Sequence, residues 1–83
     1  MNMQNNNFKK MAAARKFSCK SGYDQLRKGD MPLFREKLME RLGMSTPAGV
    51  YGRIRGEVEP KASEVIIIEE TFAEFGVTEN IWG

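Results

Sequence analysis

Residues 30–56 read DMPLFREKLMERLGMSTPAGVYGRIRG, and this stretch predicts two helices joined by a short turn. In its first part Phe34, Leu38 and Leu42 recur every four residues, which places them on one face of a helix. The opposite face is charged. Gly43 is the kind of residue that ends a helix, because glycine adopts the left-handed conformation without steric cost.

A second helix is expected over residues 46–56. Thr46 has a hydroxyl that can cap the first turn, Pro47 suits the first helical position, and Gly56 is typical of the residue after a helix end. The apolar residues of this segment follow the i, i+3, i+4, i+7 spacing of a buried stripe: Pro47, Val50, Tyr51 and Ile54.

The remaining segments also have helical periodicity. A short helix is expected over residues 23–28, and a long one from Pro60 to about residue 76. Within the long helix, Ile66–Ile68 cover about 200° of the circumference, so this helix either lies centrally or meets a second subunit. Trp82 is expected to fold back onto the core. The fold class is therefore all-α, a small four- or five-helix bundle.

The composition excludes several classes of protein. The chain has 83 residues, enough for one domain, and no apolar run approaches the roughly 20 residues that cross a bilayer. No secretory signal is evident, and we expect a cytoplasmic protein. Cys19 is the only cysteine and histidine is absent, so we expect no disulfide, metal site, cofactor or small-molecule substrate. We find no catalytic triad and no phosphate loop, and we expect that the protein is not an enzyme.

Charge is distributed unevenly along the chain. Residues 1–28 carry seven Lys/Arg and one Asp, whereas residues 56–83 carry one Lys and seven Glu. We interpret residues 1–20 as a disordered or partly helical basic arm and residues 21–83 as the folded domain. Because the N-terminal part of the chain is positive and the C-terminal part is negative, we expect one face of the protein to bind a polyanion. The basic residues of the arm are candidate phosphate contacts: Lys9, Lys10, Arg15, Lys16 and Lys20.

The second helix carries the strongest functional signal. Counting 100° per residue, Gly49, Gly52 and Arg53 point away from the apolar stripe, with Ala48 and Arg55 on the flank. Each glycine inside a helix costs roughly 0.8–1 kcal/mol relative to alanine. A face without side chains lets another surface approach the backbone, and an adjacent arginine can contact guanine or phosphate. Alternatively, the glycines admit a neighbouring helix and the arginines are solvated.

Residues 22–83 resemble the lambda-repressor-like helix-turn-helix proteins of bacteria and phages. The resemblance depends on residues 38–57 (LMERLGMSTPAGVYGRIRGE), residues 60–77 (PKASEVIIIEETFAEFGV) and the ending Ile81-Trp82-Gly83. It implies a scanning helix, a recognition helix, a fourth helix and a closing turn. It further implies operator binding as a dimer, with Ser45 to Arg53 as the reading surface.

The chain departs from this family at two places. Met39 stands where the family usually has a small residue, and the apolar pair Tyr51 and Ile54 comes about two residues later than usual after Gly43. We therefore expect a longer turn between the two helices.

The leading prediction is sequence-specific binding of double-stranded DNA for transcriptional regulation, with helix 46–56 in the major groove and a homodimer as the bound form. Arg53 is the main candidate for base contact. The full set of candidate contacts outside the arm is Ser45, Thr46, Ala48, Gly49, Gly52, Arg53 and Arg55. The prediction requires that the flank between Thr46 and Arg55 be accessible and electropositive.

An alternative from another class is a small protein-interaction module, such as an adaptor or a phage accessory protein. In that case Ile66–Ile68 and Trp82 mark the interface, and the basic arm is incidental or binds RNA. The salt dependence of binding separates the two, because phosphate contacts weaken steeply with salt and an apolar interface does not.

Overall fold

The computed structural model describes residues 17–83, and within that range the fold is all-helical, as predicted. Four α-helices follow one another: α2 (Lys20–Gln25), α3 (Met31–Arg41), α4 (Pro47–Arg55) and α5 (Ala62–Glu74). A 3-10 turn, η1 (Lys28–Asp30), leads into α3. The predicted phosphate contacts Lys9, Lys10, Arg15 and Lys16 lie outside the described residues.

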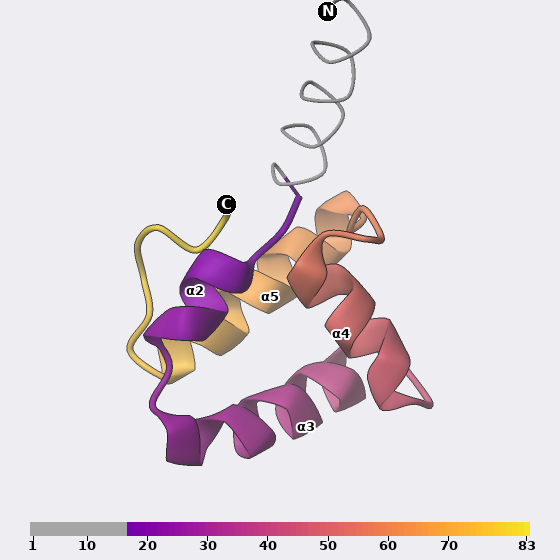
Figure 1. Ribbon diagram of the computed structural model, residues 1–83. Coiled ribbons are helices and arrows are strands. Elements are labelled where there is room, and N and C mark those ends of the chain that lie inside the picture. Colours follow the sequence, from indigo (N-terminus) through magenta and orange to yellow (C-terminus); the bar gives the residue numbers. More distant parts are fainter. Residues whose placement is uncertain (1–16) are drawn as a thin grey trace, which may run out of the picture.

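The helices enclose one core. In Figure 1, α5 passes behind α2, α3 runs along the bottom of the domain, and α4 lies on the right. Apolar side chains from all four helices and from the C-terminal tail fill the space between them, because each helix has one apolar stripe to bury. The buried apolar residues are Cys19, Leu26, Phe34, Leu38, Val50, Ile54, Ile68, Phe72, Val77 and Ile81.

Helices α3 and α5 pack through aromatic rings. Phe34 is fully buried, and its ring centroid lies 4.4 Å from that of Phe72 and 5.7 Å from that of Phe75. At the edge of this contact the guanidinium of Arg41 pairs with Glu74 at 2.6 Å. Removing the Phe34 ring would leave a large cavity, which typically costs about 3–5 kcal/mol.

The boundaries of α3 and α4 agree with the glycine and proline signals. Gly43 and Gly56 both adopt positive φ, 68° and 80°, and each follows a helix end. Residues 42–46 connect α3 to α4. Thr46 is the N-cap residue of α4, as predicted, but its side chain makes no capping hydrogen bond.

Helix α2 begins earlier than the predicted range 23–28. It covers Lys20–Gln25, and Ser18 and Cys19 just before it are buried. The last residues of the segment that we assigned to the arm are therefore part of the folded domain. The reason lies in contacts to distant parts of the chain, which no local pattern reveals.

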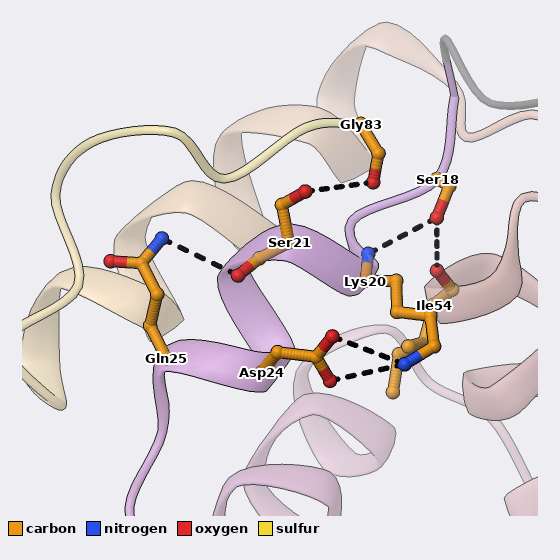
Figure 2. Close-up of polar contacts among 7 residues, drawn as sticks. All are labelled: Ser18, Lys20, Ser21, Asp24, Gln25, Ile54 and Gly83. Atoms are coloured by element: carbon orange, nitrogen blue, oxygen red, sulfur yellow. Dashed lines mark hydrogen bonds and ion pairs between the residues drawn. The ribbon is translucent and has the colours of Figure 1, made fainter.

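Those contacts come from the C-terminal tail and from α4. The N–H of Gly22 donates to the carbonyl of Ile81 at 2.8 Å, and the N–H of Gly83 donates to the carbonyl of Ser18 at 2.7 Å. Figure 2 shows the hydroxyl of Ser18 reaching the carbonyl of Ile54, at 2.9 Å, in the last turn of α4. The segment before α2 is thus held between the tail and α4.

Trp82 folds back onto the core, as predicted. Its side chain is half-buried, and its indole N–H donates to Glu69 of α5 at 2.8 Å. Within residues 17–83 no helix has the length and apolar content required to cross a membrane.

Candidate nucleic-acid interface

Helix α4 buries its predicted apolar stripe, but the face predicted to be open is partly covered. Val50 and Ile54 of the stripe are almost fully buried, at 1% and 3% exposure. At about 100° per residue the opposite side of the helix carries Ala48 and Arg55, which are exposed, and Gly52, which is buried. The accessible part of this side is therefore centred on Ala48 and Arg55, the residues predicted to flank the open face.

The prediction that Gly52 is open to an approaching surface is wrong. The chain turns back over it after α4, so that its carbonyl accepts hydrogen bonds from the N–H groups of Glu57 and Val58, at 2.8 and 3.3 Å. A Cβ added at Gly52 would lie 3.4 Å from the side chain of Val58. This glycine is covered by the turn that follows α4, whereas the sequence-based alternative had a neighbouring helix there.

Gly49 is half-buried rather than open. An added Cβ would come within 2.8 Å of the sulfur of Met44, which lies in the connection before α4. Both helix glycines thus face parts of the protein.

Arg53 is not an accessible cation, which corrects the prediction that it faces outward. Its side chain is only 15% exposed and forms a two-pronged ion pair with Glu64 of α5, which is 14% exposed. Nε and Nη2 donate to the two carboxylate oxygens at 3.2 Å each, and Nη1 donates to the carbonyl of Gly49 at 3.3 Å. Arg53 therefore joins α4 to α5.

The same carboxylate also caps α5. Oε1 of Glu64 accepts the backbone N–H of Lys61 at 3.0 Å. This backbone hydrogen bond, together with the Arg53 guanidinium, holds the pKa of Glu64 below its ordinary value. Glu64 is thus ionised at neutral pH and fixes the start of α5 against α4.

Two arginine side chains gather around Tyr51. The Cζ atom of Arg35, from α3, is 5.4 Å from the centroid of the Tyr51 ring, and that of Arg55 is 5.6 Å from it. Arg35 also donates a hydrogen bond to the hydroxyl of Tyr23, on α2. We call Arg35, Tyr51 and Arg55 the Tyr51 cluster.

The two arginines of the cluster differ in their partners. Arg55 is 53% exposed and pairs with Glu57 at 3.0 Å, an exposed pair that solvent screens. Arg35 forms no ion pair with any carboxylate of residues 17–83. Its charge is therefore available to an anionic ligand.

Further polar groups lie near the start of α4. Ser45, Thr46 and Ala48 are exposed, as the prediction required. Between α3 and α4 lies a small groove beside the Tyr51 cluster, lined by Pro32, Arg35, Glu36, Met39, Pro47 and Val50. The first turn of α4 and the cluster thus flank one concave, mostly apolar surface.

Of the predicted arm contacts, only Lys20 lies within the described residues. It begins α2 and pairs with Asp24 at 3.1 Å, as Figure 2 shows. Just before it, the N–H of Cys19 donates to the carbonyl of Ile54 at 3.0 Å. The first described residues therefore lie beside the last turn of α4, the helix that ends at Arg55.

The alternative interface is smaller than predicted. Ile66 is 58% exposed, but Ile67 is half-buried and Ile68 is fully buried. Trp82 is half-buried against the core. Only Ile66 remains as a fully exposed member of the predicted apolar band.

Sequence reasoning missed two members of the candidate site. Tyr51 was assigned to the buried stripe, and Arg35 was treated as part of a solvated polar face. The available signal was the spacing of Ala48, Tyr51 and Arg55, which share one face at i, i+3 and i+7.

The described residues hold no cluster of metal-ligating side chains and one thiol, which is buried. Residues 17–83 contain no group of three His, Cys, Asp or Glu that could hold a metal ion. The Cys19 thiol is buried, which raises its pKa from 9.0 to about 12, so it is a poor nucleophile.

Comparison of the chain with family models, with curated proteins and with solved structures finds no match.

Proposed function

We propose that this protein binds double-stranded DNA in a sequence-specific manner and regulates transcription, with α3 and α4 acting as a helix-turn-helix. The observation that carries the proposal is the Tyr51 cluster. Two guanidinium groups from successive helices converge on the half-buried Tyr51, and one of them, Arg35, has no carboxylate partner among residues 17–83. Guanidinium groups in this position contact phosphates or guanine edges.

The surroundings of the cluster support the same proposal. Ser45 and Thr46 expose hydroxyls at the start of α4, where they can donate to phosphates. The basic arm precedes Ser18, which is hydrogen-bonded to the last turn of α4. Its Lys and Arg residues would therefore add phosphate contacts next to those of α4.

The contact set proposed from the sequence changes accordingly. Arg53 and Gly52 leave the list of groups that touch DNA, and Arg35 and Tyr51 join it. We further propose that a homodimer is the bound form, because two-fold operators present two equal half-sites to two copies of the reading helix.

The test is a salt series on duplex DNA. Purified protein is titrated with a labelled mixed-sequence duplex at several salt concentrations, and the slope of log K against log salt is measured. Each lost phosphate contact lowers the slope by about 0.9. Arg35→Gln and Arg55→Gln should each weaken binding and flatten the slope by about that amount if each contacts one phosphate.

A matched control comes from the same helix. Lys37 of α3 lies two residues after Arg35 and faces α5, where it pairs with Glu74 at 3.6 Å. Lys37→Gln makes the same charge change and should leave the slope as in the wild type. No retention of duplex at low salt, or equal effects of the Arg35 and Lys37 variants, would refute the proposal.

The exposed Ile66 favours a second candidate, a protein-interaction module that uses the outer face of α5. If the protein is such a module, its binding to a protein partner should depend little on salt, and Ile66→Ser should abolish that binding. If the protein instead binds DNA through the Tyr51 cluster, Ile66→Ser should leave duplex binding unchanged, because Ile66 lies on α5 outside the cluster.

A further inference from the structure

The outward face of α4 has few of the side chains that normally read base edges. Arginine and lysine read guanine, and asparagine and glutamine read adenine. From Thr46 to Tyr51 the accessible side chains of α4 include none of these types. Arg53, which could have served, is held by Glu64.

The chemistry that remains on this part of the face is apolar. Ala48 presents a methyl group, and Tyr51, one turn later on the same face, presents an aromatic ring. In the major groove, the base feature that such groups recognise is the 5-methyl group of thymine. Thymine is the only one of the four DNA bases that presents a methyl group there.

The Tyr51 ring is contacted by two arginine side chains, one from α3 and one from α4. Arg35 lies against it from α3 and is itself anchored on Tyr23, while Arg55 lies against it from the last turn of α4. A ring with two torsion angles and two cationic neighbours loses little freedom on binding, which favours a defined contact. The two guanidinium groups also place positive charge next to the ring, where DNA phosphates could bind.

We propose that Ala48 and Tyr51 form a thymine-reading surface, which contacts the 5-methyl group of thymine in the major groove while Arg35 and Arg55 bind the adjacent phosphates. This inference rests on the proposed function, because it assigns a chemical preference to the same face of α4.

The experiment uses a duplex selected by the full-length protein from a random library. The selected duplex is resynthesised with uracil in place of thymine, one position at a time, so that only a methyl group is lost. Affinities are measured by fluorescence anisotropy. At one or more positions the loss should be about fourfold, as expected from the burial of one methyl group.

The variants show which side chains contact the methyl group. Ala48→Gly should bind the thymine and uracil duplexes equally, since it removes the protein's methyl group at an exposed position. Tyr51→Phe keeps the ring and should keep the difference. Lys37→Gln, on the far side of α3, is the matched control and should also keep it.

The possible outcomes separate the two proposals. If no duplex is enriched and none is retained at low salt, the proposed function fails. If a duplex is enriched but uracil substitution never weakens binding, or if Ala48→Gly and Tyr51→Ala both keep the full difference, the thymine-reading surface is refuted while DNA binding stands. Circular dichroism confirms that each variant is folded.

Discussion

Replacing Arg53 with alanine removes the link between α4 and α5. The wild-type guanidinium makes two hydrogen bonds of 3.2 Å to Glu64 and one of 3.3 Å to the carbonyl of Gly49. The variant leaves the Glu64 carboxylate, which is 14% exposed, without its counter-ion. An unpaired and largely shielded charge is costly, because water reaches it poorly.

The expected magnitude follows from these contacts. A hydrogen bond to a charged group contributes about 1.5–3 kcal/mol when buried. The pair lies at the edge of the core, so partial access of water reduces the loss, and we expect Arg53→Ala to cost about 2 kcal/mol of unfolding free energy. For a domain of this size that corresponds to a decrease in melting temperature of about 8–16 °C.

Thermal and urea unfolding followed by far-ultraviolet circular dichroism measure this loss. The control is Glu64→Gln, which keeps an oxygen for the backbone N–H of Lys61 and should cost about 1 kcal/mol. In a double-mutant cycle, the two positions should couple by about 1–2 kcal/mol. An unchanged melting temperature of Arg53→Ala, together with lost discrimination between duplexes, would show that Arg53 contacts bases and would refute this reasoning.

Four further measurements test other parts of the structure. A backbone N–H and an ion-pair partner lower the pKa of Glu64 in the folded state. The stability that ionised Glu64 contributes is therefore present above its ordinary pKa of 4.5 and is lost as the pH falls through the lowered pKa. In a plot of unfolding free energy against pH, Glu64→Gln should make the fall in stability at acid pH less steep. Gly22→Ala should destabilise by about 1–3 kcal/mol in urea, since the new Cβ would lie 3.1 Å from the backbone of Ile81. Gly49→Ala should leave the melting temperature equal or higher, because alanine favours the helix by about 0.8–1 kcal/mol and only a flexible methionine must move. The thiol of Cys19 should react with Ellman's reagent at pH 8 only as fast as the protein unfolds, and immediate labelling of the native protein would contradict its burial.

Much of the helical architecture could be predicted from local signals. The repeat of Phe34 and Leu38 identified the buried face of α3, and both residues are fully buried. Gly43 and Gly56 marked the ends of α3 and α4, because the left-handed conformation that they adopt is one that glycine tolerates. Such signals act within a few residues of the chain, and there they were reliable.

The covering of the opposite side of α4 could not be predicted in the same way. Apolar spacing correctly placed Val50 and Ile54 in the buried stripe, but it left Gly52, about 180° away on the helix, open to an approaching surface. Gly52 is buried because the turn after α4 packs onto it, with the side chain of Val58 3.4 Å from where a Cβ would lie. Periodicity does not contain that tertiary contact.

The ion pair between Arg53 and Glu64 could not be predicted, for a related reason. Arg53 and Glu64 are eleven positions apart, on two different helices, so no i, i+4 rule connects them. The start of α2 was missed because Ser18 and Cys19 acquire their partners from α4 and from the tail, 34 and more residues away. Long-range pairing of polar groups has no signature in a single sequence.

The hydrogen bonds of Ser18 and Gly22 link the start of the described chain to α4 and to the C-terminal tail. We therefore expect these distant segments to open together in the native protein. The amides of Gly22 and Gly83 donate across about sixty residues of sequence, so neither is released by fraying of a single helix. Detachment of residues 81–83 would free α2 and remove the donors on the Ile54 carbonyl in the same event. The amides at these contacts should therefore exchange with deuterium at a shared rate, as one cooperative opening unit.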